Sequence, residues 1–213
     1  NKQVIVWGIE GPNIVGGYNS LNFAGGGFLY DGTTWTTIGD PESPESTMIR
    51  GISGNNLVGV YGDNMRGCIY NGSTFTALDD PGATDTQIED ISGNNIVGCY
   101  NRLSAAFLYD GSTWTTLVCP FATGDTQAMG VSGNNIVGDY SNATGIHGFF
   151  YDGNTWMTLD DPSAVGQTYA TAVDGNRVVG YYADASGIHH GFIVNVPEPA
   201  SVIWVALFCG LLV

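Results

Sequence analysis

Short apolar stretches alternate with turn residues along almost the whole chain. Runs of four to seven residues rich in Val, Ile, Tyr, Phe, Trp and Thr are bounded by Gly, Asn and Asp, as in NNIVGDY at 134–140 and GFFYDG at 148–153. Such runs are typical of β-strands. The SGNN and YDG segments suit tight hairpins, because Gly and Asn tolerate the positive φ that two-residue turns require. Since the repeats contain no sustained helical period, the pattern predicts an all-β protein.

The strand pattern recurs five times. A Val-Gly pair marks each unit, with its Gly at Gly16, Gly59, Gly98, Gly138 and Gly180, 39 to 43 residues apart. Each of the first four units contains four predicted strands and ends in a linker with Pro or Gly. Units of about 40 residues with four strands are the signature of propeller blades. The sequence therefore predicts a five-bladed β-propeller. Its predicted extent is 1–196, with blades at about 4–47, 48–86, 87–126, 127–168 and 169–196.

The fifth unit stops after its third strand. No DGxTWTTL segment follows HHGFIVNV at 189–196, so the last blade is predicted to lack an outer strand of its own. The strand that contains Phe192, Ile193 and Val194 would then be an open sheet edge. Open edges recruit further strands, which makes this strand a candidate contact surface.

Aromatic residues recur on either side of the last turn of the first four units. Tyr30, Tyr70, Tyr109 and Tyr151 precede the turn, and Trp35, Phe75, Trp114 and Trp156 follow it. A cross-strand ladder of this kind is expected to fill the wedge between adjacent blades. The alternative is a ring of ligand-stacking aromatics, in which Trp35, Trp114 and Trp156 would contact a sugar.

Charge restricts the choice of partners. The chain carries 20 acidic residues against 5 Lys and Arg, a formal net charge of −15. Because such a chain repels phosphate backbones and anionic headgroups, nucleic acid is not expected as a partner. Sparse charge combined with abundant Gly and polar uncharged residues is typical of secreted β-rich proteins.

The segment from His147 to Tyr182, HGFFYDGNTWMTLDDPSAVGQTYATAVDGNRVVGYY, resembles the extracellular bacterial repeats of the HAF family. Units of that family run His-small-Phe, a turn, a Thr-Leu/Asp-x-Pro stretch and then Ala-x4-Gly-x2-Val-Gly. The likeness covers residues 7–194. The resemblance implies a repeat fold and an exported protein, and it implies no particular reaction.

The chain ends in a segment unlike the repeats. Pro197-Glu198-Pro199 precedes an apolar run from Ala200 to Val213. This end resembles the PEP-CTERM sorting tail of Gram-negative bacteria, which implies a location outside the cell or at its surface. The run has 14 residues, whereas a helix needs about 20 to span a bilayer. Membrane contact is therefore expected only transiently, through the sorting tail.

Two functions fit this pattern. The first is an exported structural protein whose copies form a head-to-tail filament or tube through the tail and the open last blade. The tail residues assigned to this assembly are Pro197, Glu198, Pro199, Val202, Ile203, Trp204, Leu207 and Phe208. The second is an extracellular glycan-binding, lectin-like propeller that is anchored or sorted at the cell envelope. The apolar tail and the near-identical repeats favour the first.

The residue types that carry chemistry show no catalytic or metal-binding pattern. Cys68, Cys99, Cys119 and Cys209 lack the spacing of metal ligands. A buried thiol is expected at Cys68, with a Cys68–Cys99 bridge as the alternative. No Ser-His-Asp set or nucleophile elbow occurs. We therefore expect no enzyme activity, metal or cofactor.

Two further residue types belong to the repeat. His147, His189 and His190 lie in GIHGF and GIHHGF, at equivalent places in two units. Acid pairs stand before Pro at Asp79-Asp80 and Asp160-Asp161. Asp before Pro commonly initiates a turn, so these acids are interpreted as turn residues, with a calcium site as the alternative.

Overall fold

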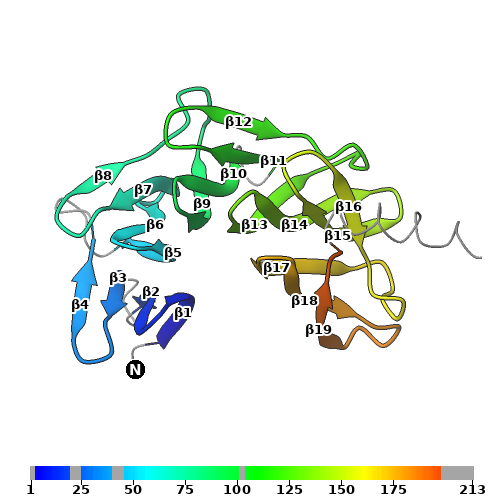
Figure 1. The fold of residues 1–213 in the computed structure, drawn as a ribbon, viewed down its shortest axis with the longest axis horizontal. Helices are drawn as coiled ribbons and strands as arrows, with labels where there is room; N and C mark the ends of the chain where they lie inside the picture. Colours follow the sequence, from blue (N-terminus) through cyan, green and yellow to red (C-terminus); the bar gives the residue numbers. More distant parts are fainter. Residues whose placement is uncertain (1–2, 20–24, 40–45, 101–103, 198–213) are drawn as a thin grey trace, which may run out of the picture.

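The computed structural model describes residues 3–19, 25–39, 46–100 and 104–197. These residues form 19 β-strands in five antiparallel sheets, and no α-helix occurs among them. The sheets lie around a central axis like the blades of a propeller (Figure 1). The prediction of an all-β, five-bladed propeller is confirmed.

Each blade runs in chain order from an inner strand at the axis to the rim. Blade 1 consists of β1 (Gln3–Glu10), β2 (Asn13–Asn19), β3 (Gly25–Tyr30) and β4 (Trp35–Ile38). Blade 2 consists of β5 (Met48–Ser53), β6 (Asn56–Tyr61), β7 (Arg66–Tyr70) and β8 (Phe75–Ala77). Blade 3 consists of β9 (Thr86–Ser92), β10 (Asn95–Tyr100), β11 (Ala105–Tyr109) and β12 (Trp114–Leu117). Blade 4 consists of β13 (Thr126–Ser132), β14 (Asn135–Asn142), β15 (Gly145–Tyr151) and β16 (Trp156–Leu159). Blade 5 consists of β17 (Thr168–Asp174), β18 (Arg177–Ala183) and β19 (His189–Asn195).

Two repeated turns explain why the same short motifs recur in the units of the sequence. Between the first and second strands, the Gly of SGNN adopts a positive φ, for example 60° at Gly133. Between the third and fourth strands, an Asp or Asn side chain caps the turn. Asp110 Oδ1 accepts hydrogen bonds from the backbone N of Ser112 at 2.9 Å and of Thr113 at 2.8 Å. The two motifs therefore encode the first and third hairpins of a blade.

A β-bulge in every inner strand explains the Gly of the Val-Gly pair. The strand register shifts by one residue in all five blades, and in blade 4 the shift lies between Ala128 and Gly130. The neighbouring strand approaches this kink closely. A Cβ atom at Gly138 would lie 1.9 Å from the carbonyl oxygen of Gln127. No side chain fits there, so the second strand of each unit carries Gly at this place.

Four apolar clusters hold the blades together, one at each interface between successive blades. At the interface of blades 3 and 4, Val97 and Ala106 share a cluster with Ile136 and Phe149. Burial of each large side chain stabilises the fold by roughly 1.5–3 kcal/mol. The repeat thus reproduces one packing arrangement around the axis.

The aromatic ladder lies on the face of each blade that meets the preceding blade. Trp114 packs on Tyr109 in a tilted arrangement with 4.7 Å between ring centroids, and Trp156 stacks on Tyr151 at 4.5 Å. Both indoles pack against the clusters between blades, in agreement with the packing interpretation. Trp35 occupies the same position in blade 1 but is 61% exposed, because no preceding blade covers it among the described residues.

The last blade has three strands, as predicted. β19 pairs with β18 on one side, and the described residues supply no strand on its other side. An opening separates this blade from blade 1 (Figure 1). β1 packs against β5, whereas no comparable contact joins β1 to blade 5.

The predicted tail falls almost entirely outside this description. Pro197 is exposed at the end of the last described range. Glu198, Pro199, Val202, Ile203, Trp204, Leu207 and Phe208 lie outside the described residues. Within the described ranges, no helix is long and apolar enough to cross a membrane.

Candidate functional site

The bulges of the inner strands direct one side chain per blade toward the propeller axis. The bulge residues are Trp7, Arg50, Glu89, Met129 and Thr171. All five line a central cavity of about 540 Å³. Because each blade contributes a different side chain, the channel is not surrounded by a set of identical ligands.

Charged groups in this channel link neighbouring blades. Arg50 and Glu89 form a largely buried salt bridge between blades 2 and 3. Burial raises the pKa of the Glu89 carboxyl, and the charge of Arg50 opposes that shift. Asp90 accepts hydrogen bonds from the backbone N of Ile91 at 2.8 Å and of Val131 at 2.9 Å, while burial raises its pKa to about 6. The Nε atom of Arg50 is buried without a hydrogen-bond partner among the described residues. The salt bridge and the hydrogen bonds of Asp90 join blades 2, 3 and 4.

A second site lies between blades 4 and 5. His147 of β15 and Asp160, just after β16, border a polar pocket of about 130 Å³, and Gln167 and Thr168 close it from blade 5. Thr168 is 1% exposed, and its hydroxyl has no hydrogen-bond partner among the described residues. Leaving a buried hydroxyl unpaired costs about 1–3 kcal/mol. A polar molecule in the pocket would supply the missing partner.

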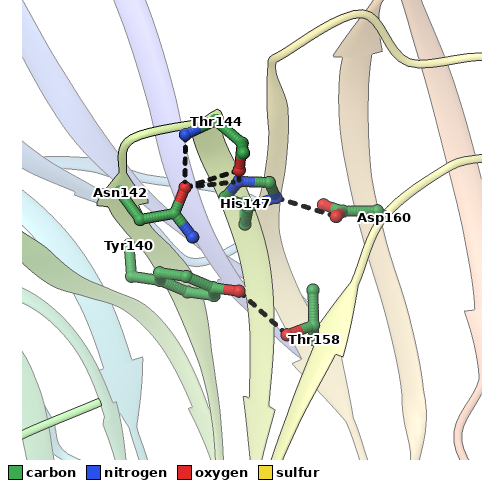
Figure 2. A network of polar contacts seen from close by, with 6 residues as sticks. All are labelled: Tyr140, Asn142, Thr144, His147, Thr158 and Asp160. Carbon is green, nitrogen blue, oxygen red and sulfur yellow. Dashed lines mark hydrogen bonds and ion pairs between the residues drawn. The ribbon is translucent and has the colours of Figure 1, made fainter. Parts of the chain in front are cut away.

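His147 is held in place from several sides (Figure 2). Its Nδ1 lies 2.8 Å from Asp160 Oδ2, and its Nε2 lies 2.9 Å from Thr144 Oγ1 and 3.1 Å from Asn142 Oδ1. The imidazole also stacks on Tyr140, with 5.2 Å between ring centroids. The orientation of the imidazole is therefore set by the protein itself.

An apolar pocket of about 220 Å³ adjoins the polar one. The apolar residues that line it are Leu159, Pro162, Phe192, Ile193 and Val194. Asp160 and Asp161 border both pockets. We name the two adjoining pockets together the blade 4–5 groove, which has polar residues in one part and apolar residues in the other.

Blade 2 contains an equivalent pair of a basic residue and an acid, with Arg in place of His. Arg66 lies at the place of His147, with its guanidinium carbon 5.5 Å from the centroid of the Tyr61 ring. Its Nε donates to Asp79 Oδ2 at 2.9 Å. Asp79 is the first acid of an Asp-Asp-Pro segment, as Asp160 is in blade 4. The first acid of each segment therefore binds the basic residue of its own blade.

The second acid of these segments is a turn residue, as predicted. Asp80 Oδ1 accepts a hydrogen bond from Gly82 N at 2.7 Å, and Asp161 Oδ1 accepts one from Ser163 N at 2.8 Å. For the first acid, Asp79 or Asp160, the turn interpretation is incomplete. The described residues contain no group of three or more His, Cys, Asp or Glu that could hold a metal ion.

The pairing of His147 with Asp160 was not predicted from the sequence. A signal for it exists, because Arg66 and Asp79 are 13 residues apart and so are His147 and Asp160. The predicted edge residues Phe192, Ile193 and Val194 lie on β19, as expected, and they also line the groove.

The remaining candidates lie elsewhere. Trp114 and Trp156 pack on tyrosines within blades 3 and 4, and Trp35 lies on the exposed face of blade 1. Cys68 is buried and unbridged, as are Cys99 and Cys119.

No family model and no curated protein matches this chain. Among solved structures, a mutant of the Aleuria aurantia lectin in complex with α-methyl-L-fucoside matches with a TM-score of 0.50 and 13% identity, over 90% of this chain and 73% of the lectin. A second structure of that lectin, described as a six-bladed β-propeller with a novel mode of fucose recognition, matches with a TM-score of 0.50 and 14% identity, over 93% and 79% of the two chains. At these identities the likeness shows a shared propeller fold.

Proposed function

We propose that this chain is an extracellular carbohydrate-binding, lectin-like propeller and that the blade 4–5 groove is its sugar site. The observation that carries the proposal is the unpaired, buried hydroxyl of Thr168 beside the oriented His147 and the Asp160 carboxylate. Binding sites combine a few placed polar groups with apolar walls. The groove has both.

The chemistry of the groove suits a small sugar. A pyranose presents hydroxyls, which both donate and accept, around a ring with apolar C–H faces. Asp160 offers a carboxylate acceptor, Gln167 an amide and Thr168 a hydroxyl. Phe192 and Val194, which lie on the face of β19 toward blade 4, form the apolar wall on which a ring face would pack.

The fold supports the same proposal. The Aleuria aurantia lectin binds α-methyl-L-fucoside on a propeller that this chain resembles in fold. The net charge of −15 also favours neutral glycans over anionic ones. Export to the cell surface stays a prediction from the PEP-CTERM-like tail.

The decisive variant is Thr168→Val. Because it removes an unpaired hydroxyl and keeps the side-chain shape, the folded state should be equally stable or more stable. Affinity for the sugar should nevertheless fall at least about tenfold, since the ligand loses a buried hydrogen bond. Isothermal titration with methyl α-L-fucoside, followed by a panel of neutral glycans, measures both the binding and its loss.

Two histidine variants supply the matched pair. His147→Ala should weaken binding by a similar factor, because it removes the group that orients Asp160. His190→Ala removes a histidine that also stacks on a Tyr and contacts an acid, Asp184 at 2.8 Å, but lies outside the groove. It should leave affinity unchanged. Equal losses in the two variants, or no glycan binding at all, would refute the assignment.

Self-assembly is the second candidate. The observation that favours it is the unpaired edge of β19, where Ile193 is exposed. A strand from a second copy could pair there, and a contact of that kind that does not close produces filaments. Electron microscopy of the purified protein would show filaments or tubes if this edge directs assembly, and dispersed single particles if it does not.

A further inference from the structure

The inner strand of blade 1 exposes apolar side chains that the other blades bury. On each inner strand one residue stands opposite the Gly of the Val-Gly pair. In blades 2 to 5 these residues are Ile49, Ile88, Ala128 and Ala170, and each is 0% exposed. In blade 1 the residue is Val6, which is 56% exposed. Three positions further on, Ile9 is 70% exposed, whereas Ile52, Ile91 and Val131 are 8%, 4% and 4% exposed.

Blade 5 shows the same contrast on its opposite face. The Val of the Val-Gly pair is Val15, Val58, Val97 and Val137 in blades 1 to 4, and each of these is 0% exposed. Its counterpart in blade 5, Val179, is 39% exposed, and Ile193 beside it on β19 is 64% exposed. In repeat proteins a terminal unit that ends the array has a polar outer face. Neither end of this array has one.

The two uncovered faces border the same opening (Figure 1). One is the face that meets a preceding blade, and the other is the face that meets a following blade. At each existing interface these two kinds of face pack together, as Val15 of blade 1 does with Ile49 and Leu57 of blade 2. The opening is therefore bordered by the two kinds of apolar face between which a further blade would pack.

We propose that the opening holds one further four-stranded blade of the same repeat, joined to this polypeptide ahead of β1. Such a blade would cover Val6 and Ile9 with one face and Val179 and Ile193 with the other. Its outer strand would continue through a linker into β1, as the outer strands of blades 1 to 4 continue into the next inner strand. The ring would then be closed with six blades.

Other occupants fit less well. The residues from 197 onward do not carry the four-strand pattern of the repeat. A second copy of the chain that inserted its blade 1 into the opening would place its blade 2 where blade 1 of the first copy already lies. The fold comparison agrees with an incomplete ring, because the matches cover 73% and 79% of lectin chains, one of which is described as six-bladed.

The test adds a blade and asks whether the uncovered faces become buried. Residues 127–168 form the most complete unit together with its linker, and fusing a second copy of them ahead of residue 1 places a blade next to β1. The fused chain should remain monomeric in light scattering. Amide hydrogen exchange in β1 and β18 should slow at least about tenfold, and the Tm should rise by several degrees, on the order of 5–10 °C.

A matched variant separates docking from mere attachment. In the added unit, Val137→Asp places a charge on the face that would cover Val6, and it should abolish both the slower exchange in β1 and the rise in Tm. Val6→Asp places the charge on the blade 1 side of the same contact. It should hardly change the Tm of the five-bladed chain, where the side chain is exposed, and should lower that of the fused chain by several degrees.

Three results would overturn the proposal. One is unchanged exchange in β1 and β18 of the fused chain. Another is a fused chain that does not fold under conditions in which the five-bladed chain does. The third is concentration-dependent dimerisation of the five-bladed chain that protects Val6 and Val179, which would assign the opening to a second copy.

Discussion

Blade 4 and blade 1 are built from the same repeat and differ in what surrounds them. In blade 4, Val131 packs at the interface with blade 3, and Val137 packs at the interface with blade 5. In blade 1, Val6 and Ile9 stand at positions that blade 4 buries, yet they are exposed. The repeat therefore sets the strands and hairpins. A side chain between blades is buried, and so stabilises the fold, only where a neighbouring blade packs against it.

Adding one methyl group at the Val-Gly glycine should produce the largest effect. Gly138→Ala places a Cβ 1.9 Å from Gln127 O in a blade packed on both faces, and Gly16→Ala makes a similar clash 2.1 Å from Ile5 O. We expect Gly138→Ala to lower the free energy of unfolding by more than about 4 kcal/mol. Gly16→Ala should cost less, because β1 is free to move away. Urea denaturation followed by circular dichroism measures the free energy of unfolding of both variants. Equal losses would contradict the expected difference between blade 4 and blade 1.

Protonation of a buried acid sharpens the contrast further. Asp139 of blade 4 occupies a buried position that Val60 and Cys99 hold in blades 2 and 3. Burial, and secondarily the charge of Asp125, raises the pKa of Asp139 to about 7 from 3.8. The folded state thus binds a proton that the unfolded chain releases near pH 4. The stabilisation that protonated Asp139 gives the folded state is fully present below pH 4 and is lost as the pH rises through about 7.

The expected loss is on the order of 2–4 kcal/mol between pH 4 and pH 8. Asp139→Asn should flatten this part of the pH profile, because the amide does not titrate. Asp184→Asn is the control, since Asp184 is on the surface and the hydrogen bond from His190 lowers its pKa. Denaturation at a series of pH values measures the profile, and an unchanged slope in Asp139→Asn would contradict the prediction.

Truncation of the repeat valine gives the smallest expected effect and the most direct comparison. Val137→Ala removes two methyl groups from a fully buried site and should cost about 2 kcal/mol. Val179→Ala changes the matching, exposed residue of blade 5 and should cost less than about 0.5 kcal/mol. The difference should shrink if a further blade covers Val179. Thermal denaturation of both variants provides the values, and similar costs in the five-bladed chain would contradict the burial pattern.

Much of the fold could be predicted from the sequence, because each hairpin depends on residues that are close to one another in the chain. Gly133 and Asp110 act within a few residues of their own positions, so their turns follow from sequence alone. The absence of a DGxTWTTL segment after 196 likewise predicted the three-stranded last blade. The groove was harder to predict. Thr168 and His147 belong to different blades, and nothing in either segment reveals that they border one pocket.

The sequence by itself determined the number of blades, their strands and the glycine that faces each bulge from the second strand, because these depend on spacing and on contacts within one repeat. Only the tertiary structure decided which faces are covered. Val137 and Val179 carry the same side chain in the same motif, yet one is buried and the other is exposed. Burial depends on the neighbouring blade, and the arrangement of blades around the axis is what brings a neighbour to one residue and leaves the other facing the opening.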